Sequence, residues 1–167
     1  TTILNSGRRL NNLVTNLLDA SLLRKKKLSV RMTDDTHLFQ IVEDVLAVCR
    51  SINKNTDVKL VNGVSANEPP FKCDSLRLSQ IINNLVNNSI KFTFVGSITV
   101  SAKIEHKQNG SNFIAIRVRD TGIGIAEENQ KKIFVSLRQV DEDADRKCGG
   151  TGLGLAISRD LAIAMGG

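Results

Sequence analysis

Three side chains on one predicted helix carry groups that could bind phosphate and a metal ion. In the segment LSQIINNLVNNSIKFT, residues 78–93, Asn84, Asn88 and Lys91 stand at i, i+4 and i+7. This spacing places two carboxamides and one ammonium group in a single narrow stripe along a helix. Carboxamide oxygens can coordinate a divalent cation, and an ammonium group can pair with phosphate oxygens. The stripe therefore predicts a contact with a nucleoside triphosphate and its metal ion.

A carboxylate followed by two glycines forms a second candidate ligand site. Asp120 ends a predicted strand, and Gly122 and Gly124 follow it in DTGIGIA. Glycine lets the backbone approach a ligand closely, and a carboxylate accepts a hydrogen bond from an exocyclic amine. Adenine carries such an amine where guanine has a carbonyl, so Asp120 predicts selection of ATP over GTP. For an isolated motif of this kind, an Asx-turn that closes a loop is the alternative interpretation.

A third glycine-rich segment, GGTGLGLAISRDLA at residues 149–162, leads into a helix with periodic apolar residues. Such an entry exposes the unpaired backbone N–H groups of a helix N-terminus to an anion. The segment lacks the Lys-Ser/Thr of a Walker motif and does not match the spacing of the dinucleotide fingerprint. A flexible loop before an ordinary helix is the alternative interpretation.

A polar segment lies between the two glycine-rich motifs, at residues 131–148. Ile133, Phe134 and Leu137 are its few apolar anchors. A polar loop bounded by glycines on both sides is typical of a lid over a binding site. Its cations could reach a triphosphate, although each of them alone is better explained as a solvated surface charge: Arg138, Arg146 and Lys147.

The remaining segments are expected to supply the elements that position these groups. Apolar periodicity predicts helices at 36–52 and 78–93, and Asp74 is a plausible N-cap for the second of them. The residues expected on the buried stripe of that helix are Leu78, Ile81, Ile82, Leu85, Ser89 and Phe92. Alternation or turn signals predict strands at 28–32, 58–61, 97–105 and 112–119, with a hairpin loop at Asn109-Gly110. The fold class expected is α+β, a two-layer sandwich whose helices cover one face of the sheet.

The N-terminal residues predict a long helix outside this sandwich. Between Ile3 and Leu23 the apolar residues form a wide helical stripe with no obvious partner in the adjacent sequence. Such a stripe is typical of a helix bundle or a coiled-coil-like dimer. A helix that packs on its own domain is the alternative.

Composition excludes several classes of function. The 41% hydrophobic fraction allows a packed core, and the net charge of +6 favours anionic partners. Nucleic acid is a weak interpretation, because no aromatic residues are interleaved with the scattered basic ones. The three cysteines match neither a zinc site nor a disulfide framework, which points to a reducing cytosol. No run approaches the roughly 18 apolar residues of a membrane span.

The motifs occur together in the order and spacing of one family. The chain resembles the ATP-binding catalytic domain of sensor histidine kinases, in the GHKL or Bergerat-fold ATPase superfamily. NLVNNSIKFT resembles the asparagine box, DTGIGI the first glycine box, IFVSLRQVD a degenerate phenylalanine box, and GGTGLGLAIS the second glycine box. RLNNLVTNLLDAS resembles the second helix of the dimerisation and phosphotransfer hairpin. The resemblance implies a mixed sheet, residues 1–27 as part of that hairpin, and residues 28–167 as a C-terminally truncated catalytic domain.

The resemblance also implies a role for each matching residue, with ATP and Mg²⁺ as ligands. Asn88 would coordinate Mg²⁺, Asn84 and Lys91 would complete the catalytic group, and Asp120 would recognise the adenine amino group. The full set of nucleotide-binding residues implied is Asn84, Asn88, Lys91, Asp120, Gly122, Gly124, Ile125, Phe134, Arg146, Gly150, Thr151, Gly152, Leu153, Gly154 and Leu155. Gly150, Gly152 and Gly154 would act as hinges of the lid.

The chain departs from the family in its histidines. The H-E/D-L-R-T-P segment with the phosphoacceptor histidine is absent, and neither His37 nor His106 has that context. The fragment is therefore expected to act on a histidine supplied elsewhere. The resemblance further implies a homodimer through the N-terminal helix, a response-regulator receiver domain as partner, and a cytoplasmic location. Any membrane attachment would come from parts of a longer parent protein, and nucleic acid is not expected as a partner.

Two other functions remain in competition with the kinase. Conformational ATPases of the gyrase and chaperone kind place a water-activating glutamate one turn before the metal-binding asparagine. This chain has Asn84 there, and a carboxamide cannot act as a general base. The other alternative is an ATP-binding scaffold that signals by dimerisation and lid ordering without phosphotransfer.

Overall fold

The computed structural model describes residues 7, 14–15, 17–19, 21–22, 25, 28–53, 55–106, 112–134 and 152–167. These residues belong to two compact units. One unit is Met32–Gly124, and the other comprises Thr1–Arg31 together with Ile125–Gly167.

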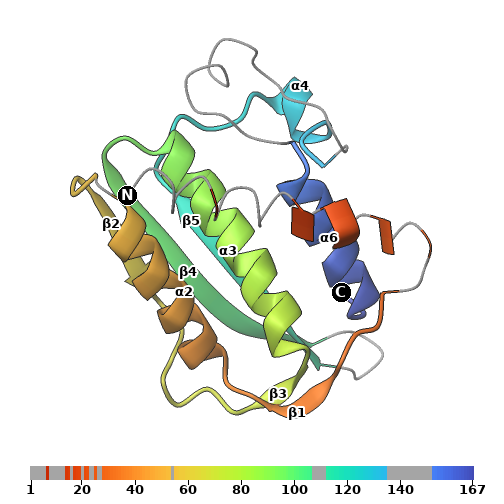
Figure 1. Ribbon diagram of the computed structural model, residues 1–167. Coiled ribbons are helices and arrows are strands. Elements are labelled where there is room, and N and C mark those ends of the chain that lie inside the picture. The colour runs from red at the N-terminus through yellow and green to blue at the C-terminus, as the bar shows by residue number, and fades with distance from the viewer. Residues whose placement is uncertain are drawn as a thin grey trace. The chain divides into compact units, whose positions relative to one another are not determined.

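A mixed three-stranded sheet forms one layer of the unit Met32–Gly124 (Figure 1). Its strand order is β2-β4-β5, where β2 is Val58–Asn62, β4 is Gly96–His106 and β5 is Asn112–Asp120. β2 runs parallel to β4, and β5 runs antiparallel to β4 in a register that pairs Ile98 with Asp120. The predicted loop at Asn109-Gly110 lies outside the described residues, but the hairpin strands on either side of it are confirmed.

Two helices form the second layer, over one face of this sheet (Figure 1). They are α2 (Leu38–Ile52) and α3 (Ser75–Phe92), and they pack against each other as well as on the strands. The Asp74 carboxylate accepts a hydrogen bond from the Arg77 backbone N–H at 3.1 Å, so the predicted N-cap of α3 is confirmed. The α+β sandwich expected from the sequence is therefore present.

The buried stripe of α3 is rotated from the predicted one. Val86 is fully buried although the predicted stripe did not contain it. Three members of the predicted stripe are only half-buried, namely Ile81, Leu85 and Phe92. The reason is that α2 covers one flank of α3, where the Cys49 thiol lies 3.8 Å from Oδ1 of Asn83. The buried face of α3 is therefore the one that points between the sheet and α2.

The strand predicted at residues 28–32 is wrong. These residues have no regular secondary structure, and the strand is β1 (Thr33–Thr36), which pairs antiparallel with β3 (Phe71–Cys73). β3 follows a proline pair and is too short to show alternation, so it was not predicted. The hydroxyls of Thr33 and Thr36 each donate to the Cys73 carbonyl at 3.2 Å. Pairing with a distant segment, rather than local alternation, decides where this strand lies.

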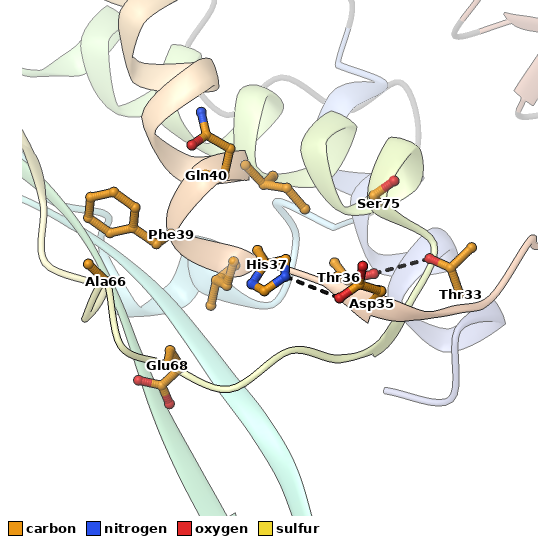
Figure 2. Close-up of a pocket in the computed structure, with 11 residues that line it drawn as sticks. Thr33, Asp35, Thr36, His37, Phe39, Gln40, Ala66, Glu68 and Ser75 are labelled. Atoms are coloured by element: carbon orange, nitrogen blue, oxygen red, sulfur yellow. Dashed lines mark hydrogen bonds and ion pairs between the residues drawn. The ribbon is translucent and has the colours of Figure 1, made fainter.

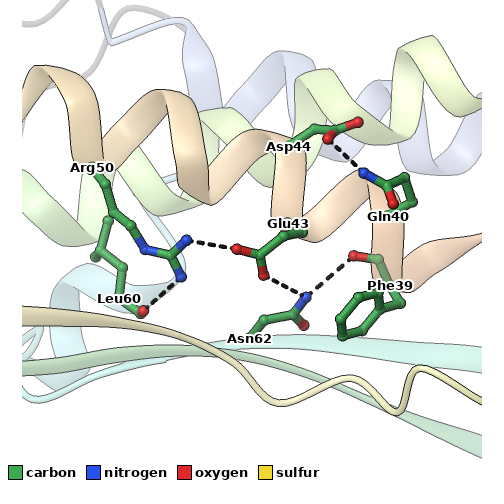
Figure 3. Close-up of polar contacts among 7 residues, drawn as sticks. All are labelled: Phe39, Gln40, Glu43, Asp44, Arg50, Leu60 and Asn62. Atoms are coloured by element: carbon green, nitrogen blue, oxygen red, sulfur yellow. Dashed lines mark hydrogen bonds and ion pairs between the residues drawn. The ribbon is translucent and has the colours of Figure 1, made fainter.

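A group of polar contacts joins α2 to the end of β2 (Figure 3). Arg50 Nη1 donates to Oε1 of Glu43 at 2.7 Å, and Arg50 Nη2 donates to the Leu60 carbonyl at 3.1 Å. Asn62 Nδ2 donates to Oε2 of Glu43 and to the Phe39 carbonyl, each at 3.2 Å. Hydrogen bonds from Arg50 and Asn62 lower the pKa of Glu43 from its ordinary value of 4.5. The contacts hold the helix on the strand at the surface.

The lowered pKa of Glu43 predicts a pH-dependent contribution to stability. A carboxyl whose folded pKa is lowered contributes stability above the unfolded pKa, and this contribution is lost as the pH falls through the folded pKa. The Arg50 and Glu43 side chains are 43% and 38% exposed, so solvent screens the pair. We expect Glu43→Gln to lower the free energy of unfolding by about 0.5 kcal/mol at neutral pH. The difference in unfolding free energy between the wild type and Glu43→Gln should vanish in urea titrations repeated below the lowered pKa. The same difference at every pH would contradict the prediction.

The second unit holds the other described elements. α6 (Gly154–Ala164) begins within the predicted glycine-rich segment, whereas the four-residue helix α4 (Glu127–Gln130) was not predicted. In the predicted N-terminal helix, the described residues at 14–15, 17–19 and 21–22 have helical backbone, and most of the rest lies outside the described residues. The role of this segment in a dimer stays a prediction. None of the described helices is long and apolar enough to cross a membrane.

Two of the three cysteines are buried free thiols. Cys49 and Cys73 are both buried in the unit Met32–Gly124, and burial raises the pKa of each thiol. A raised pKa lowers the fraction of reactive thiolate. Cys148 lies outside the described residues.

Candidate functional site

The asparagine-rich helix and the DTG motif meet at a hydrogen bond. Ser89, buried on α3, donates from Oγ to Oδ2 of Asp120 at the end of β5, at 3.0 Å. The other carboxylate oxygen, Oδ1, accepts a hydrogen bond from the Gly122 backbone N–H at 3.0 Å. The Asx-turn considered from the sequence therefore forms, and it coexists with the contact to α3. The Asp120 side chain is exposed, so a ligand can reach its remaining lone pairs.

The three residues of the polar stripe are half-buried on α3. Asn88 directly precedes Ser89, so it lies on the helical turn that contacts Asp120. Asn84 is one turn earlier, about 6 Å along the helix axis. The Lys91 ammonium nitrogen lies 4.6 Å from the centroid of the Phe92 ring, within the range of a cation–π contact. The helix therefore presents two carboxamides and a cation in one stripe, and the turn that bears Asn88 also bears Ser89, which contacts Asp120.

The oxygen atoms that this stripe offers fit a Mg²⁺ ion that takes most of its other ligands from phosphate groups. Among the described residues, none is hydrogen-bonded to the Asn88 carboxamide, whereas Asn84 and Lys91 both have partners. No group of three or more His, Cys, Asp or Glu in the described part of the chain could hold a metal ion by itself. Mg²⁺ commonly takes one or two protein oxygens and completes its shell with phosphate and water oxygens. A single asparagine ligand therefore fits a magnesium–nucleotide complex better than a free ion.

The loop that follows Asp120 is attached to the start of β4 through Thr121, and to the end of α3 through Gly122 and Ile123. Thr121 Oγ1 accepts a hydrogen bond from the Ser97 backbone N–H at 3.1 Å, beside the turn that leads from α3 into β4. The Ile123 backbone N–H donates to the Phe92 carbonyl at 3.2 Å. A Cβ atom at Gly122 would lie 2.4 Å from the Phe92 carbonyl oxygen, so only glycine fits there. The close approach made by Gly122 is therefore to the backbone of α3.

This packing predicts that Gly122→Ala destabilises the unit. The added methyl group would also lie 2.9 Å from Thr93 Oγ1, a buried hydroxyl that has no hydrogen-bond partner among the described residues. Both the loop and the end of α3 would have to shift, and we expect the free energy of unfolding to fall by about 2 kcal/mol. Gly124→Ala is the matched control, because Gly124 has φ of +72° and open space around it. We expect about 1 kcal/mol there from backbone strain alone. Urea unfolding of the two variants should show the larger loss for Gly122→Ala, and the reverse order would contradict the clash.

The other predicted site residues fall in the second unit or outside the described residues. Ile125 and Phe134 are exposed in the segment around α4. Four predicted site residues of the second glycine box stand before or within the first turn of α6, and they are Gly152, Leu153, Gly154 and Leu155. Gly152 has φ of +65°, a conformation that favours glycine. Arg146, Gly150 and Thr151 lie outside the described residues. The roles given to all these residues stay predictions.

Sequence reasoning assigned Ser89 to the apolar stripe and missed its contact with Asp120. A signal was present, because a serine among apolar residues on a buried helix face needs a hydrogen-bond partner. Thr121 was missed as well, and only its position between the aspartate and the glycine pointed to it.

A separate cavity of about 450 Å³ lies at the other end of α3 (Figure 2). Its lining includes His37, Glu68 and Ser75. A hydrogen bond of 3.1 Å joins Nε2 of His37 to Oδ1 of Asp35. Ser75 is 14 residues before Ser89, about 21 Å along the helix. The cavity contains none of the predicted site residues and is distinct from the Asp120 site.

Comparisons with known proteins show the family to which the chain belongs. Residues 73–167 match the family model described as histidine kinase-, DNA gyrase B-, and HSP90-like ATPase. The chain is 34% identical over 164 residues to hybrid signal transduction histidine kinase C of Dictyostelium discoideum, covering 97% of this chain and 13% of the relative. It is 35% identical over 167 residues to the signal transduction histidine-protein kinase BarA of Escherichia coli, covering 99% of this chain and 18% of that protein. The chain thus spans less than a fifth of the length of these relatives.

Solved structures show the same fold. The crystal structure of full-length ShkA in complex with AMPPNP superposes with a TM-score of 0.79 at 28% identity, over 97% of this chain and 32% of ShkA. The histidine kinase AdeS of Acinetobacter baumannii superposes with a TM-score of 0.75 at 23% identity, over 98% of this chain and 71% of AdeS. The family match includes α3, the DTG motif and α6. The chain belongs to the family of histidine kinase-, DNA gyrase B- and HSP90-like ATPases.

Proposed function

We propose that the chain binds ATP with Mg²⁺ and transfers the γ-phosphoryl group to a histidine outside these 167 residues. The observation that carries this proposal is the 3.0 Å hydrogen bond between Ser89 and Asp120, because it joins the Asp120 carboxylate to the turn of α3 that bears Asn88. A nucleotide whose base reaches Asp120 can extend its phosphates along the polar stripe of α3. The names of the relatives, which are signal transduction histidine kinases, support the reaction.

Each residue of the site would perform one task in this reaction. Asp120 would accept a hydrogen bond from the adenine amine, Lys91 would pair with phosphate oxygens, and Asn88 would hold Mg²⁺ with Asn84 beside it. The metal ion would neutralise charge that develops on the phosphate oxygens. An imidazole nitrogen of the acceptor histidine would attack the γ-phosphorus, while the bond to the β–γ bridging oxygen breaks and ADP leaves. Positioning and charge neutralisation are the main contributions that a protein makes to phosphoryl transfer.

Asn84 favours transfer to histidine over hydrolysis. The residue is half-buried on the stripe, one turn before Asn88, where related ATPases place a glutamate. A carboxamide cannot take a proton from water at neutral pH, so water bound nearby would not be activated. Slow hydrolysis preserves ATP until the acceptor histidine arrives.

A reconstituted transfer assay tests the proposal. The 167-residue chain would be mixed with a separately produced dimerisation hairpin that bears the family histidine, together with Mg²⁺ and ATP labelled at the γ-phosphate. We expect acid-labile, alkali-stable label on that histidine, and no label when it is replaced by glutamine. Nucleotide binding without any labelled hairpin would instead support a non-transferring ATP-binding scaffold.

The assembly and location of the parent protein stay proposals. We infer a homodimer through the N-terminal helix and passage of the phosphoryl group to a receiver domain, because the relatives are signal transduction histidine kinases by name. We also propose a cytoplasmic site of action, since ATP would be the phosphoryl donor.

A further inference from the structure

The hydroxyl of Ser89 is an exception on its face of α3. The buried residues one, two and three turns before it on this face are apolar, namely Val86, Ile82 and Leu78. Ser89 itself is 8% exposed, and an apolar side chain there would avoid the cost of burying a hydroxyl. Serine in a helix commonly bonds to the carbonyl one turn earlier. This hydroxyl donates instead to Asp120, 31 residues away and on another element. The contact therefore links the helix with a side chain of the ligand site.

Asp120 is held by donors from two directions. Ser89 engages Oδ2 from α3, and the Gly122 backbone N–H engages Oδ1 from the loop. The aspartate is exposed, so a carboxylate held only by the Asx-turn could still rotate about its side-chain bonds. A second donor on the other oxygen removes much of that freedom before a ligand arrives. Preorganisation of this kind strengthens binding because less entropy is lost in the complex.

We propose that Ser89 is a positioning residue that orients the Asp120 carboxylate toward the exocyclic amine of a purine base. The inference rests on the proposed function, because it takes the base at this site to be adenine. The oriented carboxylate can only accept hydrogen bonds, so it pairs with the 6-amino group of adenine and repels the 6-carbonyl of guanine. Ser89 thereby contributes to nucleotide selection without touching the nucleotide.

The test compares two nucleotides that differ only in the amine. The dissociation constants of the 167-residue chain would be measured by calorimetry for ATP and for purine riboside 5′-triphosphate, which lacks the 6-amino group. We expect the wild-type chain to bind ATP about 30-fold more tightly than the amine-free nucleotide. Ser89→Ala should reduce this ratio to about threefold and leave the affinity for purine riboside triphosphate unchanged.

Further variants separate positioning from a general structural role. Ser79→Ala is the matched control, since Ser79 is a half-buried serine on α3, ten residues before Ser89. The ratio of its two dissociation constants should equal that of the wild type. Ser89→Thr retains the hydroxyl, so most of the wild-type preference for ATP over purine riboside triphosphate should remain. In an Asp120→Asn background, Ser89→Ala should have no further effect, because the group through which Ser89 acts is already altered.

The outcomes distinguish this inference from the proposed function. A wild-type chain that binds both nucleotides equally, or neither, would refute the assignment of Asp120 to adenine. A wild-type preference for ATP that survives intact in Ser89→Ala would overturn only the role of Ser89. Equal weakening of both nucleotides in Ser89→Ala would also overturn it, because that result indicates loss of structure rather than loss of orientation.

Discussion

Asn88→Ala is expected to reduce phosphoryl transfer to the supplied histidine by about 1,000-fold. The Asn88 carboxamide would be the protein's own ligand to Mg²⁺, and none of the other described residues is hydrogen-bonded to it. Alanine removes that ligand without adding bulk and suits a helix interior. The helix α3 would then no longer supply an oxygen ligand to hold Mg²⁺ in place during the transfer. Single-turnover transfer of label from ATP to the hairpin is the appropriate measurement.

Nucleotide binding gives an independent measurement for the same variant. Wild-type affinity for ATP should rise when Mg²⁺ is added, and Asn88→Ala should lose most of that increase. Asn87→Ala is the matched control on the adjacent position of α3. Asn87 is exposed, and its Nδ2 donates to the Asn83 carbonyl at 2.8 Å, away from the stripe. Transfer at the wild-type rate by Asn88→Ala, or equal losses in the two variants, would remove Asn88 from the proposed metal site.

Asp120→Asn should weaken ATP binding by about 10- to 100-fold, because a hydrogen bond to a charged group contributes about 1.5–3 kcal/mol. The substitution keeps the shape of the side chain but turns one acceptor oxygen into a donor amide. An amide can meet the 6-carbonyl of guanine, so binding of GTP should fall much less than binding of ATP. The ratio of the two dissociation constants, measured by competition with a fluorescent nucleotide, reports this change directly.

A control aspartate separates base recognition from a general effect of charge. Asp44 is an exposed aspartate on α2 that accepts a hydrogen bond from Gln40 at 2.8 Å. Asp44→Asn changes the net charge by the same amount but should leave both nucleotide affinities unchanged. If Asp120→Asn lowered the affinities for ATP and GTP equally, the carboxylate would be structural and would not read the base.

Local sequence determined the elements with clear apolar periodicity and the motifs whose side chains could bind a nucleotide or a metal ion. α2, α3 and the β4–β5 hairpin extend over enough residues for apolar spacing to reveal them, and Asp74 caps α3 as a short-range pattern predicts. The polar stripe on α3 follows from helix geometry alone. The family was also decided at this level, because four motifs in one order are specific even when each is weak.

Tertiary structure decided the features that depend on distant partners. β1 lies at Thr33–Thr36 because its backbone pairs with β3, some 40 residues later, and no local pattern contains that partner. The buried sector of α3 is centred where α2 and the sheet together cover it, so Val86 is buried and Phe92 is half-buried. The sequence identified Asp120 and Asn88 separately. The contact between Asp120 and Ser89, the residue next to Asn88, is a 3.0 Å hydrogen bond between two elements that only the folded protein brings together.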